Sequence, residues 1–381
     1  MYVYADNAAT TRLSDRAAEA MEKCFFELYG NPSGIHKFGR DAKFVLEKSR
    51  RIIAESINAE PDGIYFTSGG TEADNWAVKS AEALGEKTGK KHIISTRIEH
   101  HAMGRPLEIL RERGFEITYI NPQENGIVSP LDFERAIRPD TVFASVMYAN
   151  NVTGVIQPIG EIGRICRRRG ILFHTDAVQA AGHIPVDAEA DFIDMLSASA
   201  HKFHGPKGAG FLYCRRPDFI EPFIWGGGQE RGMRSGTENV SGICGMAEAL
   251  SESVENMREE MEYVKSLRKI IENSVYEIKG ARINGDMKKR LPGNLNLSFK
   301  GVSGESLLRL LDREGICVSA ASACSAGLQE PNFVLEAMGI PREDARSSVR
   351  ITLSVYNTEK EARYIGNKLK ETVESLRRIS M

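Results

Sequence analysis

The sequence predicts an α/β protein with a mostly parallel sheet in its larger part and a smaller α+β unit after it. From residue 14 to about residue 213, short apolar runs alternate with segments of helical period. Such alternation is typical of βαβ units, whose parallel sheet is buried on both faces. A polar helical stretch from residue 251 to about residue 278 then ends the alternation.

The helices expected in the larger unit share apolar positions with a period near 3.6. They cover residues 37–58, a segment that starts near residue 71, residues 101–113 and residues 159–169. The expected strands are short apolar runs at residues 64–66, 92–95, 116–119, 142–147, 171–174 and 192–196. Open sheets of this kind bind ligands at the carboxyl ends of their strands, so the residues after each strand are candidates for a site.

The smaller unit is predicted from two strand-like runs and two helical ones. These are a strand at residues 294–299, a helix at 305–313, a strand near 349–353 and a closing helix at 359–378. We predict a large domain of residues 14–255 and a small domain of residues 1–13 with 256–381. Because no long linker or low-complexity tract separates them, a tight interface is expected.

Composition excludes several classes of function. The 381 residues are 41% hydrophobic and 27% charged, as in ordinary globular proteins. With 50 basic residues against 52 acidic ones, no global field attracts nucleic acid or anionic lipid, so a small molecule or a protein partner is expected. No apolar stretch approaches the roughly 18 residues of a membrane span, and no signal-peptide pattern opens the chain. Six cysteines without a CxxC pair fit a reducing compartment, so we expect a cytoplasmic protein.

The segment Ser68-Gly-Gly-Thr-Glu follows one strand and opens a helix. Its glycines let backbone N–H groups approach an anion, and the helix dipole favours negative charge, so a phosphate fits at Gly70 and Thr71. The alternative is a helix cap made by Ser68 or Thr71. Neither a GxGxxG nor a Walker A sequence is present.

Two further strand ends carry polar side chains. Asp176 and Gln179 follow one strand, where the alternative for Asp176 is an Asx-type hydrogen bond. Lys202 follows the next strand and can form a Schiff base with an aldehyde. A metal site at the nearby histidines 174, 201 and 204 is disfavoured, because no carboxylate or cysteine joins them at a ligand spacing. An anion site, an acid and a lysine at successive strand ends together match pyridoxal phosphate.

Cys324 lies among small and polar residues, ASACSAG, that offer nothing bulky to pack into a core. This setting predicts an exposed, reactive thiol, with a structural cysteine as the alternative. The other five cysteines have apolar or helical neighbours and are expected to be buried. His100 is a catalytic candidate that could stack on an aromatic ring or shuttle protons, with a structural histidine as the alternative. At residues 100 and 101, adjacent helical positions point in different directions, so one histidine at most faces the crevice.

Eight segments, read in order, resemble the NifS/IscS cysteine desulfurases over essentially the whole chain. They are residues 4–11 (YADNAATT), 68–72 (SGGTE), 99–100 (EH), 150–151 (NN), 176–179 (DAVQ), 201–202 (HK), 231–237 (RGMRSGT) and the loop of Cys324. The resemblance implies a fold type I, aspartate-aminotransferase-like structure, a homodimer and pyridoxal phosphate. It also implies conversion of L-cysteine to L-alanine, with the sulfur held as a persulfide.

The resemblance also implies roles for individual residues. Lys202 binds the cofactor aldehyde and moves the Cα proton, Cys324 is the nucleophile, and Arg350 takes the substrate carboxylate together with Asn151. The resemblance implies that three side chains contact the cofactor ring: Asp176 at the pyridinium nitrogen, Gln179 at the ring hydroxyl and His100 stacked on the ring. It implies that the phosphate is held by Gly70, Thr71, Ser199 and His201, and by Thr237 from the other subunit. After Asn151 the chain has Val152 where many relatives carry an acidic residue.

The implied partner is an IscU-like iron–sulfur scaffold or another sulfur acceptor. The family also suggests Cys324 as a ligand of a nascent [2Fe–2S] cluster shared with such a scaffold. Two alternatives stay open. One is another cofactor-sharing reaction, such as selenocysteine lyase or an aminotransferase, and the other is an inactive relative that serves as a binding platform.

Overall fold

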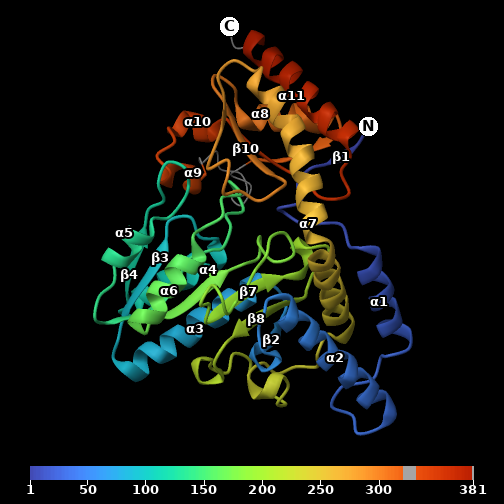
Figure 1. The fold of residues 1–381 in the computed structure, drawn as a ribbon, viewed down its shortest axis with the longest axis vertical. Coiled ribbons are helices and arrows are strands. Elements are labelled where there is room, and N and C mark those ends of the chain that lie inside the picture. The colour runs from blue at the N-terminus through green and yellow to red at the C-terminus, as the bar shows by residue number, and fades with distance from the viewer. Residues whose placement is uncertain (321–331, 380–381) are drawn as a thin grey trace.

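The computed structural model describes residues 1–320 and 332–379, and within them a seven-stranded sheet forms the centre of the larger part (Figure 1). The strand order is β2-β8-β7-β6-β5-β3-β4. The bounds are β2 (Ile64–Thr67), β3 (His92–Thr96), β4 (Glu116–Ile120), β5 (Thr141–Ser145), β6 (Leu172–Asp176), β7 (Met195–Ser199) and β8 (Gly210–Cys214). Strands β3 to β7 pair in parallel, while β8 runs antiparallel to β2 and β7. The prediction of a mostly parallel sheet in an α/β fold is confirmed.

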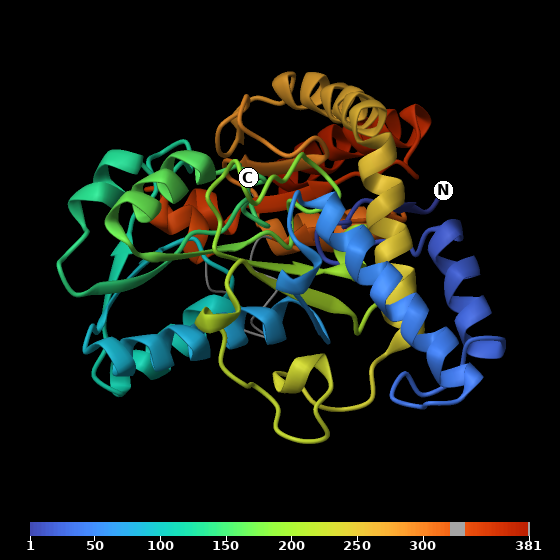
Figure 2. The ribbon, with the colours of Figure 1, turned by 60° about the horizontal axis from the view of Figure 1, so that its bottom comes forward.

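Helices cover both faces of this sheet. They are α1 (Asp15–Phe26), α2 (Lys37–Ser56), α3 (Gly70–Thr88), α4 (His101–Glu112), α5 (Pro130–Arg135), α6 (Ile159–Arg169) and α7 (Val240–Tyr276). Trp76 of α3 and Leu107 of α4 pack with Phe143 and Met195 on one face. Ile53 of α2, Ile162 of α6 and Leu250 of α7 belong to the cluster on the other face. Figure 2 shows blue α2 lying beside yellow α7, in agreement with their contacts.

A four-stranded antiparallel sheet lies in the C-terminal part, in the order β12-β13-β10-β9. Its strands are β9 (Ala281–Ile283), β10 (Asn294–Phe299), β12 (Ser319–Ala320) and β13 (Ser348–Thr352). The second half of α7, α8 (Gly304–Arg313) and α11 (Glu359–Ile379) pack on it in a separate hydrophobic cluster. N-terminal β1 (Val3–Tyr4) pairs in parallel with β11 (Ile316–Cys317) and joins this cluster.

The unit boundary near residue 255 stays a prediction. Helix α7 runs through it without a break, and begins at Val240, earlier than the polar pattern predicts. Its first turns are apolar and buried, with Ile243 and Met246 in the core of the larger part. The short helices α9 (Phe333–Ala337) and α10 (Arg342–Arg346) also contribute to that core, through Leu335 and Ala345.

One expected strand is displaced. The run at residues 192–196 begins as a strand only at Met195, because Phe192 adopts a left-handed conformation with φ of 56°. Its ring instead lies beneath the guanidinium groups of Arg164 and Arg167. Phe192 is therefore a turn residue, although aromatic residues are generally favoured in strands. Within the two described ranges, no helix is both long and apolar enough to cross a membrane.

A buried ion pair links α2 to the edge strand β2 and to the short turn η4 (Glu230–Gly232). Arg50 contacts Glu230 twice, at 2.7 Å and 2.9 Å. Arg50 also donates to the carbonyl of Ile64, and Glu230 accepts from the N–H of Phe66. Only 5% and 3% of the two side chains are exposed, so each charge depends on the other for compensation.

We predict that Glu230→Gln destabilises the protein by about 3–5 kcal/mol, because it removes the buried counterion of Arg50 and leaves only the half-exposed Glu47 beside that charge. Urea denaturation measures this change. Glu47→Gln is the control, since Glu47 contacts the same arginine but its side chain is 46% exposed, and it should cost less than about 1 kcal/mol. Equal stabilities of the two variants would contradict the prediction.

Candidate active site

Three strand ends meet at one edge of the large sheet. Asp176 ends β6 and pairs with Ser197 of the parallel neighbour β7. The turn η2 (Ala200–Lys202) follows β7 directly and carries Lys202. Strand β2 has the same direction as β7, because each is antiparallel to β8, and it leads into α3 at Gly70. The segments predicted separately from sequence are therefore neighbours in space.

A cavity of about 260 Å³ lies at this edge. It is lined by Gly70, Thr71, Asp74, His100, Met147, Asn151, Asp176, Val178, Gln179, Ser199, His201 and Lys202. All the predicted cofactor contacts except Thr237 are among them. Asp74, Met147 and Val178 also line the cavity and were not predicted.

The start of α3 fits an anion. Its N-cap is Gly69, and within the described residues no side chain caps the helix, so the predicted alternative of a cap at Ser68 or Thr71 is wrong. A Cβ added to Gly70 would lie 2.6 Å from the side chain of Val178, which leaves room only for glycine. The N–H groups of the first turn thus lack side-chain acceptors at the positive end of a 19-residue helix.

Asp176 is buried, with 4% of its surface exposed. Its Oδ1 accepts a hydrogen bond from the N–H of Val178 at 2.9 Å, so the Asx-type bond considered as an alternative is present together with the cavity position. Burial raises the pKa of Asp176, while the nearby His100 and Lys202 oppose that rise. These two neighbours favour the ionised form of Asp176.

Two further carboxyl groups are buried close to Asp176. Burial raises the pKa of Glu99 to about 8, and burial followed by the charge of Asp176 raises that of Asp74 well above its usual range. His174 lies 3.6 Å from Asp74, but burial lowers the pKa of His174 to about 3, so its ring is neutral. Glu99 therefore retains its proton near neutral pH, and burial together with the charge of Asp176 favours the neutral form of Asp74. Asp176 is the group with cationic neighbours to support its charge.

The N-terminal segment of residues 5–11 crosses the site and holds Lys202. The Nζ atom donates to the carbonyl oxygens of Ala8 at 2.8 Å and Ala9 at 2.7 Å. Gln179 donates to the same Ala8 carbonyl at 3.0 Å. His201, whose pKa is lowered to about 4 by burial and by Lys202, contacts the hydroxyl of Thr10 through Nδ1.

The two adjacent histidines differ as expected. His100 lines the cavity and is also the N-cap of α4, where its Nδ1 accepts from the N–H of Ala102. His101 is exposed and its ring lies 5.1 Å from that of Phe333.

Arg350 lies on β13, beside the cavity. Its Nη1 donates to the carbonyl of Asn151 at 3.0 Å, and its Nη2 contacts Asp6 Oδ1 at 2.7 Å. Thr237 is exposed in the single chain and does not line the cavity. Cys324 lies outside the described residues. Of the other cysteines, Cys24, Cys166 and Cys214 are buried, whereas Cys244 and Cys317 are half-buried, so the expectation of burial is only partly met.

The described ranges hold no group of three or more histidine, cysteine or acidic side chains arranged to bind a metal ion. The three histidines considered for one have other partners. His174 contacts Ser145 and Ser197, and His204 contacts the carbonyl of Arg12.

Sequence reasoning missed two acidic residues near the site. Asp74 is one turn inside α3 on its buried side. Because acidic residues are seldom fully buried, an acid on the apolar face of a predicted helix could have indicated a site. Asp6 is in the segment YADNAATT, but its pairing with Arg350 spans 344 positions and no local pattern indicates it.

Comparisons with known proteins agree with this geometry. Residues 3–365 match the family model "Aminotransferase class-V". A relative named cysteine desulfurase IscS from Dictyoglomus turgidum is 46% identical over 379 residues, which cover 99% of this chain and 96% of the relative. A solved structure named NifS-like protein is 40% identical with a TM-score of 0.93, covering 99% of this chain and all of that one. A structure of SspA in complex with cysteine is 33% identical, with a TM-score of 0.82 and coverage of 93% and 99%.

The buried Glu99 generates a pH-dependent prediction. The folded protein keeps a proton up to pH about 8, whereas in the unfolded chain the group ionises near its ordinary value of 4.5. Between these values the folded state binds more protons, so this group's contribution to stability falls as pH rises. Glu99→Gln keeps an oxygen for the bonds from Thr96 and from the N–H of Met147, but cannot ionise.

Urea denaturation at intervals from about pH 5 to about pH 9 should therefore show Glu99→Gln gaining stability relative to the unmodified protein as pH rises. Glu112→Gln is the control, because Glu112 is an exposed residue at the end of α4, the helix that follows Glu99, and it should follow the unmodified protein throughout. A constant difference for Glu99→Gln would mean that the buried carboxyl does not hold its proton.

Proposed function

The chain belongs to the NifS/IscS-type cysteine desulfurases of the class-V aminotransferase family, and on that premise we propose that it converts L-cysteine to L-alanine and passes the sulfur to an acceptor. The observation that carries the proposal is the cavity in which Lys202, Asp176 and the uncapped start of α3 lie together. A binding platform without activity would not need this combination.

The residues of the cavity fit pyridoxal phosphate, which supplies an electron sink that labilises bonds at the substrate α-carbon. The first turn of α3 at Gly70 and Thr71, with Ser199 and His201, would hold the phosphate. Asp176 would pair with the pyridine nitrogen, Gln179 with the ring hydroxyl, and His100 would stack on the ring. Lys202 would bind the aldehyde.

The protein's own groups divide the remaining work. Arg350 and Asn151 bind the substrate carboxylate, for which the planar guanidinium is well suited. Lys202 removes the proton from the substrate α-carbon and returns one at the end. The Cys324 thiolate attacks the substrate sulfur, so that an S–S bond forms as the C–S bond breaks, and the electron pair left on carbon takes up a proton. Alanine leaves and Cys324 retains a persulfide.

A homodimer is supported by apolar side chains exposed around α1 and the start of α2. They are Phe25, Phe26, Tyr29, Ile35, Phe38 and Phe44, with exposed fractions from 47% to 91%. Large exposed apolar groups gathered on one segment mark an interaction surface. A second subunit would also explain why Thr237, exposed in one chain, is expected at the phosphate of the other.

The acceptor proposed is an IscU-like iron–sulfur scaffold or another thiol-bearing protein in the cytoplasm. With such a scaffold, Cys324 is also a proposed ligand of a nascent [2Fe–2S] cluster. The chain has nearly equal numbers of basic and acidic residues, 50 and 52. A zwitterionic substrate fits this balance, because individual groups of the site would bind it and no net charge of the protein is needed to attract it.

We expect the purified protein, given L-cysteine and a reductant, to release alanine and sulfide in equal amounts. Cys324→Ala should lower this rate about 100-fold or more while leaving cofactor absorbance intact, because it removes only the nucleophile. Cys317→Ala is the control, a half-buried cysteine on β11 in the same part of the chain, and should retain activity.

Two results would contradict these assignments. Full desulfuration by Cys324→Ala would exclude that residue as the nucleophile. Turnover of selenocysteine without turnover of cysteine would identify a selenocysteine lyase instead.

A further inference from the structure

The carboxylate-binding arginine of the proposed site has an acidic partner that the mechanism does not use. Asp6 Oδ1 lies 2.7 Å from Arg350 Nη2. Only 9% of the Arg350 side chain and 21% of the Asp6 side chain are exposed, so water weakens this contact little. The second neighbour of the guanidinium, the carbonyl of Asn151, accepts from Nη1 and belongs to a residue of the cavity wall.

The backbone fixes Asp6 relative to Arg350. Asp6 forms a parallel bridge with Thr352, two residues beyond Arg350 on β13. The N–H of Thr352 donates to the carbonyl of Ala5, and Asn7 Nδ2 donates to the carbonyl of Thr352 at 2.8 Å. The hydroxyl of Thr352 accepts from the N–H of Ala8 at 2.9 Å. Asp6 is therefore attached to the strand that carries Arg350, and its carboxylate has little freedom to move away.

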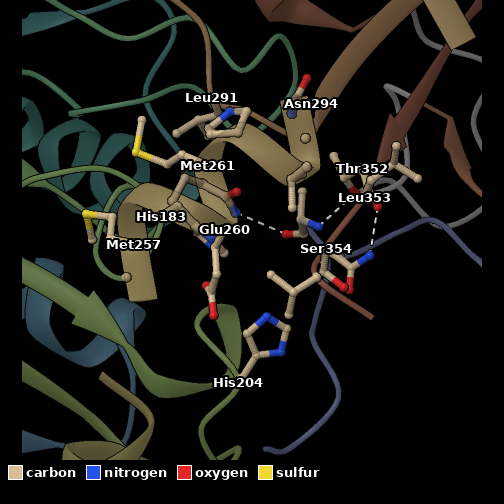
Figure 3. A pocket seen from close by; sticks show the side chains of 18 residues that line it. His183, His204, Met257, Glu260, Met261, Leu291, Asn294, Thr352, Leu353 and Ser354 are labelled. Carbon is tan, nitrogen blue, oxygen red and sulfur yellow. Dashed lines mark hydrogen bonds between the residues drawn. The ribbon is translucent and has the colours of Figure 1, made fainter. Parts of the chain in front are cut away.

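A small cavity of about 60 Å³ lies beside this attachment (Figure 3). Thr352 and Ser354 line it on one side, and Met257, Glu260 and Met261 of α7 on the other. Asn7 and Ala8 belong to the same lining, so the N-terminal segment separates this space from Lys202, which Ala8 contacts through its carbonyl.

The arginine keeps N–H donors for a ligand, and one of them is buried. Nη1 and Nη2 each use one N–H on an acceptor, whereas Nε is buried and without a hydrogen-bond partner in the described part of the chain. A buried unpaired donor on a charged group is costly, so its retention on an arginine that contacts Asn151 of the cavity wall indicates a missing acceptor. One carboxylate supplies that acceptor, and an arginine can bridge two carboxylates with its five N–H groups.

We propose that Asp6 is a positioning residue for the substrate carboxylate: it fixes the Arg350 guanidinium through Nη2 so that Nε remains available to the α-carboxylate of a zwitterionic amino acid. The inference rests on the proposed function. Asp6 does not itself contact the substrate. The Oδ1 acceptor orients the guanidinium, while the negative charge is not required and opposes an incoming carboxylate.

Orientation and charge are separable by two variants. Asp6→Ala removes the acceptor and the charge, so the guanidinium loses its fixed direction, and KM for L-cysteine should rise about tenfold with kcat changed less than about twofold. Asp6→Asn keeps an oxygen at Oδ1 and removes only the charge, so KM should equal or fall below that of the unmodified protein. Asp15→Ala, an exposed acid paired with Arg12, is the control and should change neither constant.

Calorimetric affinity for L-alanine, measured on the cofactor-loaded protein, gives a readout that does not depend on turnover. It should weaken about tenfold in Asp6→Ala and recover in Asp6→Asn. A lower KM in both variants would identify Asp6 as an anion that competes with the substrate carboxylate. Unchanged KM and affinity in Asp6→Ala would show that the pairing of Asp6 with Arg350 is structural only. Either result overturns the proposal. Failure of the unmodified protein to turn over cysteine would contradict the proposed function, and the alanine affinities would still decide the role of Asp6.

Discussion

The site depends on the register between β6 and β7. Their pairing places Asp176 opposite Ser197, so that the turn carrying Lys202 begins at the edge where Asp176 ends its strand. Because side chains alternate along a strand, a slip of one residue would turn Asp176 into one of the helical layers and leave Lys202 without its acid. Both strands are buried along their whole length, and a side-chain contact between them, His174 Nε2 to Ser197 Oγ at 2.9 Å, belongs to this register.

A second constraint is the low polarity around Asp176. Three carboxyl groups are buried together, and the described part of the chain places His100 and Lys202 beside only one of them. Burial favours the neutral forms of Glu99 and Asp74, which leaves Asp176 as the carboxylate whose charge has cationic neighbours, where a pyridinium would need it. The N-terminal segment adds a third constraint, since it contacts Lys202 through Ala8 and Ala9 and Arg350 through Asp6. The segment thereby fixes the position of Lys202 relative to Arg350, the two residues proposed to act on the substrate α-carbon and on its carboxylate.

Local sequence predicted much of this arrangement. The strand at residues 294–299 coincides with β10, and the glycine turn before α3 was placed correctly, because both depend on composition and spacing within a few residues. Long-range features were not predictable in the same way. The pairing of Asp6 with Arg350 needs the tertiary fold, and the left-handed Phe192 follows from contacts with α6 that composition does not reveal. The proposed role of Thr237 requires a second subunit, and the proposed role of Cys324 rests on its small, polar neighbours in sequence and on the family resemblance.

If these strand ends form a pyridoxal phosphate site, Lys202 is its covalent anchor. Titration of the protein with pyridoxal phosphate, followed by borohydride reduction and peptide mass analysis, tests this assignment. We expect one equivalent of cofactor per chain, a visible absorbance band, and the reduced adduct on Lys202, with no adduct in Lys202→Ala. Absence of bound cofactor, or an adduct on another lysine, would contradict it.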